Sequence, residues 1–244
     1  MLRLKVMPSL YLRCINWVKP AFFFDEGKNM IQKNKIVRNG KTLAAVFAVT
    51  ICLAFPLNAA AGPPQASSGF KWVSISDLTD EFNGRHLNYK KWMDRIDIWG
   101  GNLPGYYEQD NIKLSNGILQ LYTKAEQPLY APPNSGYKNY TTAIVISRNL
   151  VKHGYFEVRA KMQDSRADSA FWFFGFTKKN DNASEIDVYE IAAGKPGWES
   201  RVHSNLHHHV HDADQAQQFQ WTAPDDLAEN YHTYGLEWNK KKLK

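Results

Sequence analysis

An all-β sandwich is the fold class that this sequence of 244 residues predicts. Residues 154–162 alternate between apolar and polar side chains, which is typical of a half-buried strand. Asn116 and Gly117 stand between two apolar stretches and predict the tight turn of a β-hairpin. After residue 61, no long stretch shows the periodicity of an amphipathic helix. Short strands joined by turns favour one sandwich domain, with no internal repeat.

The first 61 residues are expected to lie outside this domain. Residues 42–55 form an apolar run that basic residues precede and Ala59 to Ala61 follow, a pattern that predicts a secretory signal peptide cleaved after Ala61. The alternative is a buried core helix. The run is shorter than the roughly 20 residues that span a bilayer, so we expect secretion or a periplasmic location without stable membrane insertion. Residues 1–29 would then be an extension before a start at Met30.

Charge and cysteine content change once this segment is set aside. Residues 1–61 hold nine Lys or Arg and two Asp or Glu, a net of +7, so the formal net charge of +6 of the whole chain belongs to them. The rest holds 21 basic and 22 acidic residues, which gives no reason to expect a nucleic-acid partner. Cys14 and Cys52 also precede residue 62. The mature part therefore has no disulfides and no Cys-based metal ligands.

The remaining chain divides into a short linker and one domain. Residues 62–69 are rich in Pro, Ser and Gly and predict a linker, which leaves 70–244 as the domain. Strands are expected at 112–114, 118–122, 142–146, 154–162, 170–176 and 234–238. The segment 170–176 is so apolar that we expect it in a buried layer. The chain ends soon after the last predicted strand, so we expect the domain to be incomplete at its C-terminus.

Three acids, Glu185, Asp187 and Glu190, alternate with apolar residues in one short segment. Side chains alternate between the faces of a strand, so Glu185 and Asp187 share one face while Ile186 and Val188 share the other. Glu190 is out of phase by one residue. One β-bulge between Asp187 and Glu190 would return it to the acidic face.

Such an acidic row suits glycoside hydrolysis. Carboxylates held close together raise the pKa of at least one of them. A retaining enzyme needs one ionised and one protonated carboxyl group about 5–5.5 Å apart. Strand positions four steps apart lie about 13 Å apart at the backbone, so the side chains would have to converge on a concave sheet. The spacing leaves two alternatives open, namely a solvent-facing acidic strand and oxygen ligands for a cation.

The segment Glu-Ile-Asp-Val-Tyr-Glu resembles the active-site strand of the family 16 glycoside hydrolases. It is similar to the bulged form, Glu-x-Asp-x-x-Glu, of agarases, porphyranases and κ-carrageenases. Further segments resemble the family in the same order along the chain: 80–84, 91–92, 99–105, 169–172, 204–207 and 231–238. The resemblance implies a jelly-roll β-sandwich with a concave cleft that acts on β-1,4 or β-1,3 links within long polysaccharides.

The resemblance also implies roles for the acids. Glu185 would be the nucleophile, Glu190 the general acid and then the base, and Asp187 would tune their protonation. The loop at 99–105 favours a secreted, endo-acting, retaining hydrolase of red-algal galactan, agarose or porphyran, although related loops often carry Arg where this chain has Asn102. The alternatives are a hydrolase of laminarin or another β-glucan, and a non-catalytic carbohydrate-binding protein on the same sandwich.

Four residues are candidates for substrate binding. Trp99 and Trp172 could stack on sugar rings, with core packing as the alternative. By the resemblance, His207 lies beside the sugar; the alternatives are a surface histidine and a zinc ligand together with other histidines of the same stretch. Arg148 could bind a sulfate group through two hydrogen bonds, with an ordinary solvated charge as the alternative.

We expect no required cofactor and no catalytic metal. A structural calcium ion near Asp80 or Glu81 is an open alternative because some relatives have one, although the sequence supplies no full set of oxygen ligands. The expected partner is a polysaccharide, and the protein is expected to be a monomer.

Overall fold

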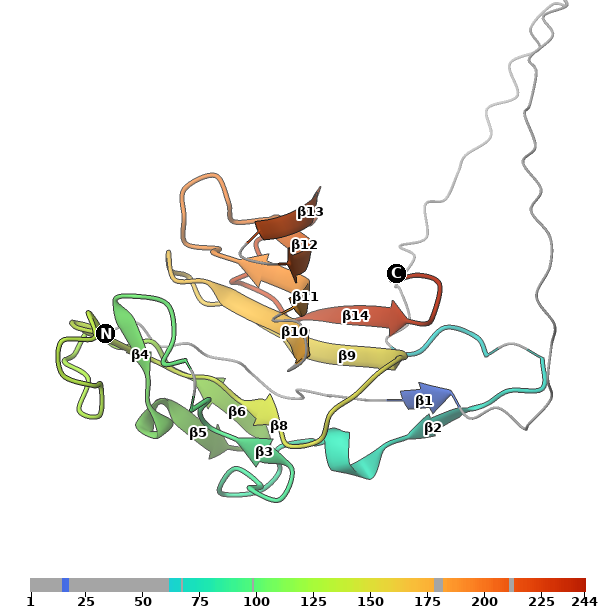
Figure 1. The fold of residues 1–244 in the computed structure, drawn as a ribbon, viewed down its shortest axis with the longest axis horizontal. Coiled ribbons are helices and arrows are strands. Elements are labelled where there is room, and N and C mark those ends of the chain that lie inside the picture. The colour runs from blue at the N-terminus through green and yellow to red at the C-terminus, as the bar shows by residue number, and fades with distance from the viewer. Residues whose placement is uncertain (1–14, 18–61, 67, 98, 178–181, 211–212) are drawn as a thin grey trace, which may run out of the picture. The chain divides into compact units, whose positions relative to one another are not determined.

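The computed structural model describes residues 15–17, 62–66, 68–97, 99–177, 182–210 and 213–244 (Figure 1). The predicted signal segment at 42–55 lies outside them, as do Cys14 and Cys52. The described chain is built from strands and two short 3-10 helices, η1 (Ser76–Leu78) and η2 (Gln109–Asn111). Within this part, no helix has the length and apolar character to cross a membrane. The predicted all-β class is confirmed.

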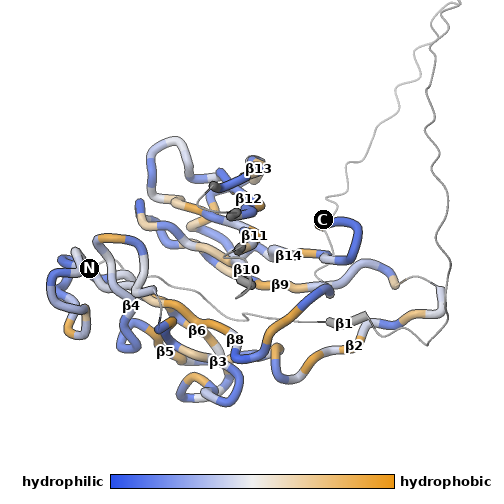
Figure 2. Tube along the Cα trace, viewed as in Figure 1, coloured by the Kyte–Doolittle hydropathy of each residue, from blue (hydrophilic) through white to orange (hydrophobic). Residues whose placement is uncertain are grey.

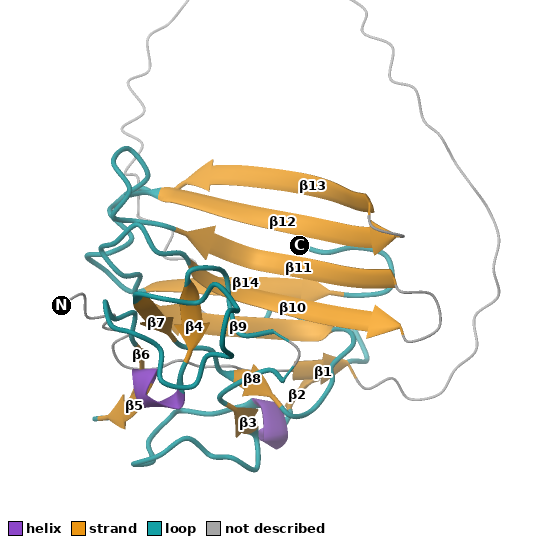
Figure 3. Ribbon diagram, turned by 60° about the vertical axis from the view of Figure 1, so that its left-hand side comes forward, coloured by secondary structure: helices purple, strands orange, loops and turns teal. Residues whose placement is uncertain are grey.

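Two four-stranded antiparallel sheets form the layers of the sandwich (Figure 3). The first sheet has the order β10-β11-β12-β13, with bounds β10 (Ser169–Thr177), β11 (Asn182–Ile191), β12 (Arg201–Val210) and β13 (Ala213–Thr222). The second has the order β14-β9-β1-β2, with bounds β14 (His232–Trp238), β9 (Gly154–Ala160), β1 (Ile15–Trp17) and β2 (Trp72–Ser74). Along the predicted linker, the amide of Gly62 donates a hydrogen bond to the buried carboxylate of Glu157 on β9.

The main core lies between these sheets. Val158 on β9 and Tyr234 on β14 pack with Tyr189 and Ile191 on β11 and with Val202 on β12. A second cluster places Phe156 of β9 against partly buried residues of β10 and β11, among them Phe171, Phe173, Ile186 and Val188. The apolar face of β11 therefore points into the sandwich, so its other face is free for polar side chains.

Three two-stranded sheets complete the described fold. They pair β3 (Trp92–Met93) with β8 (Ile146–Ser147), β4 (Gly105–Tyr107) with β7 (Tyr140–Thr142), and β5 (Ile112–Ser115) with β6 (Ile118–Leu121). Their core cluster contains Phe82, Leu87, Trp92 and Leu119. Figure 2 shows the hydrophobic residues concentrated along β6 and β8. The hairpin predicted around Asn116 and Gly117 is confirmed, and both residues have positive φ, 53° and 69°, as its tight turn requires.

Two predictions about strands are wrong. Residues 142–146 do not form one strand, because Thr142 ends β7 beside β4 whereas Ile146 begins β8 beside β3. The segment 170–176 is not buried on both faces. Phe171 and Phe173 pack into the core, but Phe174 on the opposite face is 47% exposed. The reason is that β10 is the edge strand of its sheet and a cavity lies along it.

Burial predicts a sharp contrast between two leucines. Leu227 is 0% exposed in the main core, and its backbone bonds to Glu199 and Met162, whereas Leu150 is 97% exposed. We expect Leu227→Ala to lower the free energy of unfolding by about 2–5 kcal/mol through lost burial and a residual cavity. The matched change Leu150→Ala should stay within about 0.5 kcal/mol of the wild type. Denaturant unfolding of both variants checks this, and equal losses would contradict the assigned core.

Candidate active site

A bulge in β11 sets the positions of the three acids. Against β10, Trp172 pairs with Asp187 while Phe171 pairs with Tyr189, so Val188 is the extra residue. Against β12, the register shifts between Asp187 and Glu190. Val188 and Tyr189 both pack in the core clusters, which returns Glu190 to the face of the other acids. The bulge predicted from the sequence is confirmed.

Neighbouring strands place further side chains on this face. In the paired registers, Glu185 lies between Phe174 of β10 and His207 of β12. Asp187 lies in the same way between Trp172 and Asn205. Glu190 pairs with Ala170 on one side and His203 on the other. Three carboxylates thus stand in a row, with aromatic side chains along one flank and polar side chains along the other.

Asp187 is the most buried acid of the row, at 4% exposure. The pKa of its carboxyl group is raised to about 7, first by burial and then by the nearby charges of Glu185 and Glu190, while the charge of His207 acts to lower it. A hydrogen bond with Glu185 also favours the protonated form of Asp187. At a pH below about 7, Asp187 therefore holds a proton beside Glu185, which is a suitable arrangement for keeping a neighbouring carboxylate ionised.

Glu190 is held by a residue to which the sequence analysis gave no role. Asn205 on β12 donates a hydrogen bond from Nδ2 to Oε2 of Glu190. Asp168, just before β10, lies near enough to Glu190 to be affected by its charge. The carboxyl group of Asp168 has its pKa raised to about 6, first by desolvation and then by Glu190, although part of the residue is exposed. Nothing in the local sequence distinguishes Asp168, because only the pairing of β10 with β11 brings it to the acidic row.

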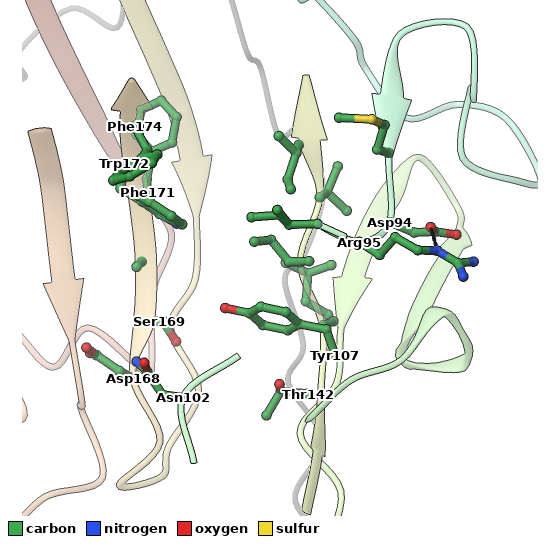
Figure 4. Close-up of a pocket in the computed structure, with 18 of the residues that line it drawn as sticks. Asp94, Arg95, Asn102, Tyr107, Thr142, Asp168, Ser169, Phe171, Trp172 and Phe174 are labelled. Carbon is green, nitrogen blue, oxygen red and sulfur yellow. Dashed lines mark hydrogen bonds and ion pairs between the residues drawn. The ribbon is translucent and has the colours of Figure 1, made fainter. Parts of the chain in front are cut away.

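A cavity of about 2150 Å³ runs along β10. In Figure 4, Trp172, Phe174 and Asp168 are on one side of it, whereas Tyr107 and Thr142 are on the other. Glu185 lines the same space. Its lining also includes core residues such as Val158 and Leu119, so the cavity extends from the open face of β10 into the space between the layers.

Trp99 and Trp172 come together at this cavity. Their rings meet edge to face at 6.0 Å, and Trp99 makes a second edge contact with Tyr107 at 5.4 Å. The loop depends on its glycines, because a Cβ at Gly100 would lie 2.5 Å from the ring of Tyr106 and Gly101 has a φ of 114°. Both tryptophans line the cavity beside the acidic row, and their stacking on sugar stays a prediction.

His207 also reaches the acidic row. Its Nε2 lies 3.4 Å from Oδ2 of Asp187, and its Nδ1 lies 2.7 Å from Oδ2 of Asp214. Arg148 lies just beyond β8, is exposed, and donates from Nε to the backbone carbonyl of Tyr89. It lines the large cavity, although this hydrogen bond ties it to the β3–β8 part of the fold. Substrate contacts by both residues stay predictions.

The carboxylate of Asp80, a candidate calcium ligand together with Glu81, is held by two hydrogen bonds. Both carboxylate oxygens of Asp80 already accept hydrogen bonds, one from the amide of Phe82 and one from Nε1 of Trp92. Among the described residues, no three His, Cys, Asp or Glu side chains gather as metal ligands would. A calcium ion near Asp80 or Glu81 stays a prediction, and no step of the chemistry below uses one.

A sandwich that gathers three carboxylates and several aromatic side chains on one face has the arrangement of a polysaccharide-degrading glycoside hydrolase. Residues 72–243 match the family described as beta-porphyranase A–D, GH16 domain. The chain therefore belongs to this family of glycoside hydrolases.

Curated relatives support this assignment. The chain is 27% identical over 208 residues to beta-porphyranase B of Phocaeicola plebeius, covering 72% of this chain and 65% of that protein. It is 29% identical to beta-porphyranase D of Zobellia galactanivorans, covering 72% and 46%. It is 26% identical to the kappa-carrageenase of Pseudoalteromonas carrageenovora, covering 74% and 51%. The chain spans about half to two thirds of the length of these relatives.

Solved structures confirm the jelly-roll fold. The crystal structure of porphyranase B from Zobellia galactanivorans matches with a TM-score of 0.63 at 25% identity, over 69% of each chain. The kappa-carrageenase from Pseudoalteromonas carrageenovora, in complex with an oligotetrasaccharide of kappa-carrageenan, matches with a TM-score of 0.59 at 26% identity, over 75% of each chain.

The raised pKa of Asp187 predicts a pH dependence of stability. Its pKa is about 7 in the folded state against 3.8 for the free side chain, so between about pH 4 and pH 7 the folded protein binds a proton that the unfolded chain has released. The free energy of unfolding should therefore fall as pH rises through this window. Asp187→Asn should flatten the slope.

Denaturant unfolding at several pH values measures this slope. Asp110→Asn, a change of an exposed Asp in η2, serves as the matched control and should leave the slope as in the wild type. An unchanged slope in Asp187→Asn would show that this carboxyl group does not hold the extra proton.

Proposed function

We propose that the chain is a secreted, endo-acting, retaining glycoside hydrolase that cleaves β-linked red-algal galactan, with porphyran as the first candidate substrate and agarose as the second. The observation that carries this proposal is the bulge at Val188, which puts Glu185, Asp187 and Glu190 on one face of β11.

The proposed chemistry assigns one task to each acid. Glu185 attacks the anomeric carbon and forms a glycosyl ester, while Glu190 gives its proton to the departing glycosidic oxygen. Glu190 then takes a proton from the water that hydrolyses the ester and releases Glu185. Asp187 favours this division because its carboxyl group holds a proton up to about pH 7 and can then donate a hydrogen bond to Glu185. Asn205 orients the carboxyl group of Glu190.

Support for the substrate class comes from the relatives and from the aromatic side chains at the cavity. The matched family is that of beta-porphyranases, and a beta-agarase and a kappa-carrageenase are also similar to the chain. Trp99, Trp172 and the exposed Phe174 offer flat apolar surfaces to the apolar faces of sugar rings. The alternative of a β-glucan substrate has less support, since LamA from Zobellia galactanivorans, solved in complex with laminaritriose and laminaritetraose, is 19% identical and indicates only the shared fold.

Secretion and a monomeric state remain part of the proposal. The basic stretch, the apolar run at 42–55 and the alanines at 59–61 support export and cleavage after Ala61. Mass spectrometry of the exported protein would determine its first residue, and a protein that keeps residues 1–61 would contradict the cleavage.

A panel of polysaccharides tests the substrate assignment. The protein is incubated with porphyran, agarose, kappa-carrageenan and laminarin, and new reducing ends are measured together with the sizes of the products. We expect porphyran or agarose to be cut into a range of intermediate lengths. Cleavage of laminarin alone would overturn the galactan assignment, and binding without cleavage of any polysaccharide would favour the carbohydrate-binding alternative.

Glu185→Gln tests the nucleophile. The amide keeps the size of the side chain but cannot attack as an anion, so we expect cleavage to fall by about four orders of magnitude while polysaccharide binding persists. Glu229→Gln changes an exposed glutamate outside the acidic row and should keep the wild-type rate. Reducing-end assays and affinity electrophoresis check both variants, and wild-type turnover by Glu185→Gln would contradict the assignment.

The anomeric form of the first product tests retention. A covalent intermediate on Glu185 requires that the newly formed reducing end has the same configuration as the bond that was cut. Proton NMR during the first minutes of hydrolysis, before mutarotation, distinguishes the two anomers. An inverted product would rule out the glycosyl ester.

A further inference from the structure

The imidazole of His207 lies between carboxylates from two different strands. Its Nε2 is 3.4 Å from Oδ2 of Asp187 on β11, and its Nδ1 is 2.7 Å from Oδ2 of Asp214 on β13. Asp214 belongs to none of the segments that resemble the family. Because β13 pairs with β12 along its length, Asp214 reaches His207 from the far side of the acidic row.

The two contacts fix the state of the ring. An ionised carboxylate can only accept hydrogen bonds, so Nδ1 of His207 must carry a hydrogen when it bonds to Asp214. This leaves Nε2, the nitrogen that faces Asp187, as the position that gains or loses the titrating proton. A carboxylate that orients a histidine in this way is a recurring arrangement in enzymes whose histidine moves a proton.

We propose that Asp214 is a positioning residue that keeps Nδ1 of His207 protonated, so that Nε2 of His207 and Oδ2 of Asp187 share one exchangeable proton. The inference rests on the proposed hydrolase function for its catalytic meaning. The geometry that carries it does not depend on the substrate.

The surroundings of His207 favour a shared proton. Among the described residues, the charged groups that face the ring are Glu185 and Asp187 from β11 and Asp214 from β13. Partial burial acts to lower the pKa of His207, but Asp214 and then the two acids of β11 raise it above its ordinary value. Asp187 in turn has a pKa of about 7. The pKa values of both groups are thus raised by the same cluster of acids.

The charge of Glu185 changes during the reaction cycle, and this change moves the proton between Asp187 and His207. When Glu185 becomes a glycosyl ester it loses its negative charge, which had raised the pKa of both Asp187 and His207. This charge is the second-largest influence on Asp187 but the smallest of those that act on His207, so Asp187 loses more of its affinity for the proton. The proton then passes from Oδ2 of Asp187 to Nε2 of His207, which leaves a carboxylate and an imidazolium. When water hydrolyses the ester and Glu185 is again an anion, the proton returns to Asp187. The net charge of the three groups changes only by the charge of Glu185.

An exposed ion pair usually has a small effect, and Asp214 is 39% exposed. The charge of Asp214 also influences Asp187, through the imidazole of His207. Asp187 is 4% exposed, and charges at such a buried position are screened much less. Asp214 therefore acts through His207 on a buried group.

Titration of His207 in the protein without substrate tests the network directly. NMR of the imidazole follows the pKa of His207, whose signal is assigned by its loss in His207→Gln. Because Asp214→Asn removes the anion at Nδ1, we expect the pKa of His207 to fall by about half a unit or more. Asp225→Asn is a matched control at a second His–Asp contact, 3.6 Å from His232, and should leave His207 unchanged.

The pH profile of kcat/KM tests the link to catalysis. Without Asp214 the imidazolium is less stable, so the pair of His207 and Asp187 releases its exchangeable proton at a lower pH. The alkaline limb of the profile should shift to lower pH by about half a unit in Asp214→Asn, and Asp214→Glu should restore part of the shift. A structural role alone would lower the stability or kcat without moving the limb.

A double mutant decides whether Asp214 acts through His207. On the His207→Gln background, Asp214→Asn should cause no further shift of the alkaline limb. An unchanged titration of His207 in Asp214→Asn, or an equal shift on both backgrounds, would overturn the proposal. If no polysaccharide is cleaved but the titration moves as expected, the proposed function fails while the positioning by Asp214 stands.

Discussion

One extra residue in β11 is the constraint on which the candidate site depends. At the bulge, Val188 and Tyr189 both face the core, and Glu190 returns to the face that carries Glu185 and Asp187. Two apolar residues in succession can point inward only because the strand is locally irregular. The packing of Tyr189 against Tyr234, with ring centroids 4.4 Å apart, therefore stabilises the same bulge that brings the third acid into the row.

Placing three carboxylates together in a partly buried row is costly, and the surrounding residues reduce this cost. Asp187 and Glu185 share a hydrogen bond, so one proton relieves the repulsion between them. Asn205 donates to Glu190, and His207 supplies a group that can become positive beside Asp187. Asn205 and His207 both lie on β12, which makes this strand as important for the chemistry as the acidic strand itself.

Much of the fold follows from local patterns. The Asn116–Gly117 turn requires positive φ, which these two residue types adopt readily. The alternation of apolar and polar side chains predicted β9, with an error of two residues at its C-terminal end. The wrong predictions concern pairing rather than composition. Residues 142–146 look like one strand, yet their two ends have different partners, β4 and β3. The apolar β10 looks buried, yet its position at the sheet edge leaves Phe174 exposed.

The sequence by itself determined the spacing of Glu185, Asp187 and Glu190 and the need for a bulge between them, because side-chain alternation is a property of a single strand. Segments that resemble the family also identified Trp99, Trp172 and His207 as candidates for substrate binding. Only the tertiary structure decided that Asp168, Asn205 and Asp214 join the acidic row. These residues belong to other parts of the sheet, and cross-strand register, which depends on pairing between segments distant in the sequence, brings them together.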